Sequence, residues 1–174
     1  MDHETRRVDA LKSFRVLDTG FDSAFDKIVT TAAMVLSTPI ALVSLVDDTR
    51  QWFKAAHGLN ARETPRGISF CQHAIEGNQS FIVEDAWRDE RFRNNPLVTR
   101  DPNIRFYAGT PLIDRDGYAL GTLCAIDTRP RSLDDRQILM LEYLADSALN
   151  ALYLHRQTLE LADARDALAE RHCA

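Results

Sequence analysis

The feature that most constrains the fold is a pair of apolar segments late in the chain, residues 106–113 and 118–126. The four residues between them are Asp114-Arg115-Asp116-Gly117. Aspartate and glycine are typical of tight turns, and glycine supplies the positive φ that such turns often need. The pattern therefore predicts a hairpin of two antiparallel strands. Pro111 has no N–H to donate, so its strand is expected to be an edge strand or to carry a bulge there.

Helices are expected on both sides of this hairpin. Apolar residues recur at helical spacing over residues 4–17, and again from an N-cap at Asp22 to about residue 36. A long final helix is expected after caps at Ser132 and Asp135. With strands between them, these helices predict an α+β fold with an antiparallel sheet rather than repeated parallel units.

The middle of the chain reads as short strands and turns. The sequence Ser69-Phe70-Cys71-Gln72 matches a capping box and predicts a short helix from residue 69 to about residue 77. One or two helical turns are expected near residues 85–92, followed by an ordered loop. Apolar and β-branched patterns predict strands at residues 40–46, 50–57 and 81–83, with a polar loop at 58–67.

Length and charge narrow the classes of function. The 174 residues fit one domain, and 21 basic against 26 acidic residues give a formal charge of −5, with no basic cluster that would follow nucleic acid. The apolar runs are far shorter than the roughly 20 residues of a membrane span, and the polar N-terminus is unlike a signal peptide. We expect a soluble cytoplasmic protein. Cys71, Cys124 and Cys173 form no CxxC pair, which suits a reducing compartment.

Seven short motifs, taken in order, resemble those of bacterial GAF domains. The resemblance covers about residues 4–152 and agrees with the order of helices and strands above. The motifs are Phe14-Arg15-Val16-Leu17-Asp18-Thr19, Ser44-Leu45-Val46-Asp47, Arg50-Gln51-Trp52-Phe53-Lys54, Glu63-Thr64-Pro65-Arg66, Ser69-Phe70-Cys71-Gln72-His73-Ala74-Ile75, Ile104-Arg105-Phe106-Tyr107-Ala108-Gly109 and Gly121-Thr122-Leu123-Cys124-Ala125-Ile126-Asp127.

The resemblance implies a PAS-related fold with a six-stranded antiparallel sheet. The N-terminal and C-terminal helices would be bundled on one face and a ligand pocket would lie on the other. It divides the chain into an N-terminal amphipathic helix (1–20), a GAF domain (21–152) and a C-terminal extension of the last helix (153–174). GAF domains are mostly sensory modules of histidine kinases, cyclic-di-nucleotide enzymes, phosphodiesterases and transcription regulators. The resemblance leaves the cofactor unknown.

The cysteines are the first candidates for chemistry. Cys71 is the second residue of the predicted short helix, where free backbone amides favour a thiolate. Cys124 shares a strand face with Thr122 and Ile126, so it could approach Cys71 if that face covers the pocket. Packing in the core is the alternative for both cysteines. His73 does not share a helix face with Cys71, so no metal site is expected.

Arginines beside aromatic residues are the second group of candidates. Such arginines suit a ligand with a carboxylate or phosphate group. Alternatively, Asp85, Asp89, Glu90 and Asp101 pair with them and hold a long loop in place. Both interpretations can hold together. The expected ligand-binding residues are Arg66, Phe70, Cys71, His73, Asp85, Arg91, Phe92, Arg105, Phe106, Tyr107, Thr122 and Cys124.

The final helix carries a third signal. Leu154, Leu161 and Leu168 recur every seven residues among charged residues, which outlines a coiled-coil seam, with a single solvated helix as the alternative. By resemblance, this helix would carry a signal to an output domain such as a histidine kinase or a cyclic-di-nucleotide enzyme.

Three functions follow from these observations. The first is a non-catalytic homodimeric sensory module that binds a small molecule or a partner protein and signals through its terminal helices. The second is a thiol enzyme, because one stand-alone GAF family reduces free methionine sulfoxide. The third is a ligand-free dimerisation module, in which Phe70, Phe92 and Tyr107 would fill the pocket.

Overall fold

A computed structural model describes residues 2–173, with side chains for residues 2–171, so the Cys173 side chain and Ala174 lie outside the described residues. Six strands form one sheet in the order β3-β2-β1-β6-β5-β4, and every neighbouring pair is antiparallel. The predicted α+β class and six-stranded antiparallel sheet are thus confirmed. The strands are β1 (Ile40–Val46), β2 (Arg50–His57), β3 (Glu63–Pro65), β4 (Phe81–Val83), β5 (Phe106–Ile113) and β6 (Ala119–Asp127).

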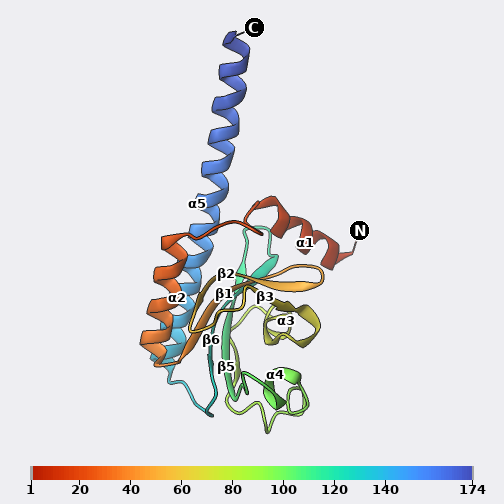
Figure 1. Cartoon of the computed structure of the whole chain (residues 1–174), viewed down its shortest axis with the longest axis vertical. Coiled ribbons are helices and arrows are strands. Elements are labelled where there is room, and N and C mark those ends of the chain that lie inside the picture. Colours follow the sequence, from red (N-terminus) through yellow and green to blue (C-terminus); the bar gives the residue numbers. More distant parts are fainter. Residues whose placement is uncertain (1, 174) are drawn as a thin grey trace.

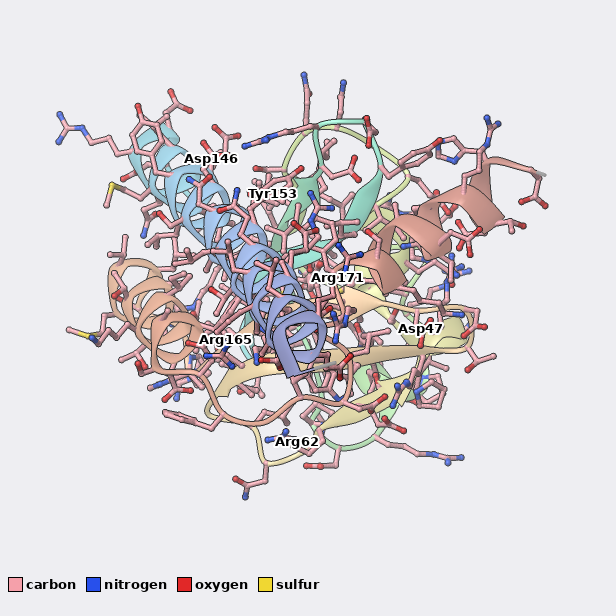
Figure 2. The ribbon with its side chains drawn as sticks, turned by 90° about the horizontal axis from the view of Figure 1, so that it is seen from above. Asp47, Arg62, Asp146, Tyr153, Arg165 and Arg171 are labelled. Atoms are coloured by element: carbon pink, nitrogen blue, oxygen red, sulfur yellow. The ribbon has the colours of Figure 1, made fainter. Side chains whose placement is uncertain are left out.

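The two long helices cover one face of the sheet, and short helices cover the other. α2 and α5 pack against each other and against the strands (Figure 1). α1 packs against β6, on the opposite side of the molecule from α2 (Figure 2), and its Leu11 joins the same apolar core. The helices are α1 (His3–Ser13), α2 (Ser23–Leu36), α3 (Phe70–Ala74), α4 (Pro96–Thr99) and α5 (Asp135–Cys173), with a 3-10 turn η1 (Arg66–Ile68) before α3.

The helices begin where side chains satisfy free backbone amides. Asp22 caps α2 by accepting from Ala24 N at 2.9 Å, as predicted. Ser69 caps α3 by accepting from Gln72 N at 3.2 Å, also as predicted. The prediction for α5 was wrong: its cap is neither Ser132 nor Asp135.

Asp134 is the N-cap of α5 instead. Its carboxylate accepts from Gln137 N at 2.8 Å, and the Gln137 side chain accepts from Asp134 N at 3.1 Å. This reciprocal pair, three residues apart, satisfies both ends of a capping box, which neither predicted residue does.

The first helix is shorter than predicted. It ends at Ser13, and Arg15 takes a positive φ of 52°. Phe14 and Val16 are both fully buried, and Phe14 packs edge-on against Tyr153 of α5 with ring centroids 5.2 Å apart. Residues two apart on a helix point in different directions, so a continued helix could not bury both. The chain therefore leaves the helix to place both side chains in the core.

Two predictions for the middle of the chain were wrong. Residues 63–65, within the loop expected at 58–67, form β3, which pairs with β2, and η1 follows from Arg66 to Ile68. Residues 85–92 form hydrogen-bonded turns rather than a helix, and α4 follows in the expected loop. Asn95 caps α4 by accepting from Leu97 N at 2.9 Å, and Pro96 occupies the first turn, where no N–H is needed.

The late hairpin matches its prediction within one residue at each strand end. Gly117 takes a φ of +86° in the turn, and the Asp114 carboxylate accepts from Asp116 N and Tyr118 N. β5 is an internal strand, but its pairing with β4 stops at Gly109, so Pro111 lies on a locally open edge. A register shift follows between Leu112 and Ile113. Among the described helices, none is long and apolar enough to span a bilayer.

Candidate functional site

The face of the sheet away from α2 and α5 carries the predicted thiol residues. Side chains alternate along a strand, so Leu123 and Ala125 of β6 face the helix-side core, whereas Cys124 and Ile126 face α3. Tyr107 of β5 lies on the α3 side as well. The capped first turn of α3 places Cys71 over these strands. The expected approach of Cys71 to Cys124 is confirmed.

Hydrogen-bonding side chains surround the Cys71 sulfur. Tyr107 Oη donates to Cys71 Sγ at 3.3 Å, and Thr122 Oγ1 donates at 3.2 Å. Cys124 Sγ lies 4.0 Å from Cys71 Sγ, and all four side chains are buried. Gly109 makes this arrangement possible, because a Cβ there would lie 2.2 Å from Tyr107 Oη. The tyrosine ring thus lies over a residue without a side chain, and its hydroxyl reaches the sulfur.

These contacts shift the pKa values of the two thiols in opposite directions. Burial opposes charge on Cys71, but hydrogen bonds from Cys124, Thr122, Tyr107 and Ser44 outweigh it and lower the pKa of Cys71 to about 6. The pKa of Cys124 is well above its ordinary value, because of its hydrogen bond to Cys71 and its burial. Burial, with the nearby sulfurs, also raises the pKa of Tyr107. The site therefore favours one thiolate among neutral donors.

An aromatic cluster fills the space next to the thiols. Phe70 stacks on Phe92 with ring centroids 4.1 Å apart and on Tyr107 at 5.3 Å. His73 meets Phe92 edge-on at 4.9 Å, and Phe81 lies beside both Phe92 and Tyr107. Phe70, Phe92 and Tyr107 are buried, so in this structure they occupy the place expected for a ligand pocket. A hollow of about 770 Å³ lies elsewhere, between β4 and residues 130–132.

The predicted arginines do not converge on this cluster. Arg66 bonds to Glu4 at 2.6 Å and to the Asp47 carbonyl at 3.0 Å, which ties α1 and the β1–β2 turn to η1. Arg105 stacks on Trp87 at 4.9 Å and donates to backbone carbonyls. These two arginines hold segments of the fold together.

Arg91 is the one predicted arginine that lies against the aromatic cluster. Its guanidinium lies 4.9 Å from the Phe81 ring centroid and 5.4 Å from that of Phe92. It also pairs with Asp89 at 2.6 Å, and Asp85 pairs with Arg88 at 3.5 Å. Of the pairs that the alternative interpretation predicted between these acids and the three arginines, the described residues therefore show Asp89 with Arg91, whereas Asp85 pairs with a different arginine.

One predicted residue lies on the helix side of the sheet, away from the thiol site, and two residues that shape this site were not predicted. Phe106 is buried among the helix-side residues, because it precedes Tyr107 on the strand and points the other way. Ser44 and Gly109 shape the thiol site but were not predicted. Ser44 could have been found as the one polar residue in the buried apolar run of β1. Among the described residues, no group of three His, Cys, Asp or Glu side chains could hold a metal ion.

Comparison with known proteins agrees with this architecture. The family model of the GAF domain matches residues 20–152. The chain is 46% identical over 144 residues to a cyclic di-GMP phosphodiesterase of Pseudomonas aeruginosa. That match covers 82% of this chain but 24% of the relative, so the chain spans about a quarter of that protein's length.

Two solved structures share the fold at low sequence identity. The GAF domain of an Acinetobacter phosphoenolpyruvate-protein phosphotransferase superposes with a TM-score of 0.64 at 16% identity, covering 91% of this chain and 97% of that one. The free methionine-R-sulfoxide reductase of Neisseria meningitidis, solved with its substrate, gives 0.61 at 17% identity, covering 91% and 95%. The family match over most of the chain, on the expected six-stranded antiparallel sheet, shows that this chain belongs to the GAF domain family.

Proposed function

We propose that this GAF domain is a non-catalytic regulatory module that pairs with a second copy of itself along α5 and passes changes in the domain to an output. The observation that carries the proposal is an apolar stripe on the exposed side of α5. The helix runs for 39 residues, and its C-terminal half projects away from the sheet (Figure 1). A projecting helix of this length suits transmission to a following segment.

The two sides of α5 differ in what they contact. Leu141, Ala145, Ala148 and Leu152 repeat at helical spacing and are buried in the core of the domain. Met140, Leu154 and Leu161 differ by multiples of seven, so they share the opposite side. The large apolar residues exposed along α5 are Leu139, Met140, Tyr143, Leu154, Leu161 and Leu168.

A second copy of the same helix is the occupant that fits this stripe. Leucine at every seventh position is the spacing of a two-stranded coiled coil. With leucine at the a position, Glu160 and Arg165 take the flanking g and e positions. In a parallel pair, Glu160 of one helix would face Arg165 of the other, which adds charge complementarity.

We further propose a small molecule as the signal and an enzyme as the output. A relative named a cyclic di-GMP phosphodiesterase supports a cyclic-di-nucleotide enzyme as the output. We propose that this domain and the output both act in the cytoplasm. A small molecule on the α3 face would have to displace the stack of Phe70 and Phe92. Binding would then shift the population between two arrangements of α3 and α5 by its difference in affinity for them.

Native mass spectrometry of the chain, purified without added ligand, tests the proposal. We expect a doubled mass for the wild type and for Ala169→Glu, which adds the same charge outside the stripe. Leu161→Glu should give a single mass with unchanged circular dichroism. A wild-type monomer, or a Leu161→Glu dimer as tight as the wild type, would contradict dimerisation along α5. An added small-molecule mass would identify a ligand.

The two alternative functions, a ligand-free dimerisation module and a thiol enzyme, can each be tested separately. The buried aromatic cluster favours the ligand-free dimerisation module, which predicts a dimer with no added mass. The contact between Cys71 and Cys124 favours the thiol enzyme. Turnover of free methionine sulfoxide that depends on Cys71 would support the enzyme, and no turnover in the wild type would eliminate it.

A further inference from the structure

We propose that Cys71 and Cys124 form a peroxide-reactive dithiol that closes to a disulfide between α3 and β6. The proposal does not depend on dimerisation along α5. The two cysteines are 53 positions apart in the chain, yet their sulfurs lie 4.0 Å apart in the core. A disulfide has an S–S length of about 2.05 Å, so the sulfurs need to approach by only about 2 Å.

The surroundings of the two sulfurs give them different roles. Two hydroxyls, from Tyr107 and Thr122, donate to Cys71 Sγ and stabilise its thiolate. Cys124 keeps its proton, since its pKa is raised by the contact with Cys71 and by burial. A thiolate beside a protonated thiol is the arrangement in which the first sulfur attacks an oxidant and the second resolves the product.

Because both sulfurs are buried, only a small oxidant can reach them without displacing other side chains. Cys71 is 2% exposed and Cys124 is fully buried, and Phe70 and Tyr107 pack against the same space. A bulky hydroperoxide or a peptide-sized disulfide would have to displace this packing. Hydrogen peroxide is close to water in size, so it is the oxidant that the site admits most readily.

Hydrogen peroxide is the only oxidant that formation of the disulfide needs. The Cys71 thiolate attacks one oxygen of hydrogen peroxide, so an S–O bond forms, the O–O bond breaks, and hydroxide leaves and takes a proton from solvent. Cys124 then attacks the sulfenic sulfur: an S–S bond forms, the S–O bond breaks, and the hydroxyl leaves as water with the thiol proton. Two thiols and one peroxide become one disulfide and two waters. A dithiol such as dithiothreitol supplies the two electrons and two protons that restore the thiols.

The test uses the chain with Cys173→Ser, which leaves two thiols. The reduced protein is treated with hydrogen peroxide, denatured, alkylated and analysed by mass spectrometry. We expect loss of both alkylation sites, a linked pair of peptides containing Cys71 and Cys124, and full recovery with dithiothreitol. With Cys124→Ser, Cys71 should instead accumulate as a sulfenic acid that dimedone traps. With Cys71→Ser, Cys124 should react at least about tenfold more slowly.

Tyr107→Phe tests whether the hydroxyl donors around Cys71 control its reactivity or whether the two cysteines merely lie close together. It keeps the ring but removes one donor, so the midpoint of the pH profile of oxidation should move upward. If the pKa rises by about one unit, oxidation at pH 6 slows about fivefold. The proposal is overturned if no linked peptide forms while circular dichroism shows a folded protein, or if Cys124 reacts as fast without Cys71. Equal rates with cumene hydroperoxide would overturn the selection by size.

Discussion

The two faces of the sheet are covered in different ways. On one face, the long helices α2 and α5 bury an apolar core that includes Phe25, Val29 and Leu36. On the other, short segments around α3 and α4 bury thiols and hydroxyls that bond to one another, along with stacked rings. Long helices supply much contiguous apolar burial, whereas short segments open at lower cost. We therefore expect most of the stability to come from the first face, whereas the candidate chemistry lies on the second.

The largest effect is expected on the helix-side face. Phe25 is fully buried among α2, the strands and the Lys54 side chain, whose Nζ lies 5.4 Å from the ring centroid. Phe25→Ala should lower the free energy of unfolding by about 4 kcal/mol, because α2 and the strands cannot collapse into the cavity. Urea unfolding followed by circular dichroism measures this loss.

The matched change on the other face should cost less. Phe92 is also fully buried, but it lies among the turns before α4 and stacks on Phe70. Phe92→Ala should lower the free energy of unfolding by about 3 kcal/mol, because short segments relax more easily. The cavity that persists in Phe25→Ala should be the better site for a small aromatic molecule. Indole should therefore raise the melting temperature of Phe25→Ala by more than that of Phe92→Ala, and should leave that of the wild type unchanged. A loss larger than that of Phe25→Ala would break the comparison.

A smaller effect is expected where α1 joins the α3 side. Glu4 accepts from Arg7 at 2.8 Å and from Arg66 at 2.6 Å, and these bonds lower its pKa to about 2, against the burial that raises it. Because the folded pKa lies below the unfolded one, the stabilisation is present above about pH 4.5 and is lost as the pH falls towards 2. Glu4 is 47% exposed, which reduces the contribution to about 1 kcal/mol.

Glu4→Gln measures that contribution. The variant should be less stable than the wild type at pH 7, and the difference should shrink as the pH falls from 4.5 towards 2. Thermal unfolding at several pH values follows it. A difference that stays constant across this range would show that the Glu4 charge contributes nothing.

The smallest effect on stability is expected at Thr122. Thr122→Val keeps the shape but removes a donor to Cys71 Sγ, so the free energy of unfolding should change by less than about 1 kcal/mol. The pKa of Cys71 should rise from about 6, because one hydrogen bond to the thiolate is lost. Ultraviolet absorbance of the thiolate during a pH titration measures the shift. Thr110→Val is the control, since Thr110 bonds to Ser80 at 2.7 Å instead; an equal shift in both variants would contradict the assignment.

Local patterns in the sequence were enough to predict most of the elements. Alternation and apolar runs located β1, β2, β4 and the late hairpin, and Asp22 and Ser69 marked the starts of α2 and α3. These signals depend on neighbours within a few residues, which is why they can be read from the chain. β3 was missed because a three-residue edge strand is defined by its partner β2 rather than by its own residues.

The candidate site was only partly predictable for the same reason. The alternation of β6 correctly placed Cys124 with Thr122. Arg66 and Arg105, in contrast, do not reach the aromatic cluster, because their partners, such as Glu4 for Arg66, lie far away in the sequence. The sequence alone determined the family, through the resemblance of its motifs, together with five of the six strands and the heptad spacing of α5, since each depends on order and periodicity. Only the tertiary structure decided that Tyr107 passes over Gly109 to reach Cys71 and that Phe70 and Phe92 fill the expected pocket. Such contacts depend on how distant segments pack in three dimensions, which no local pattern contains.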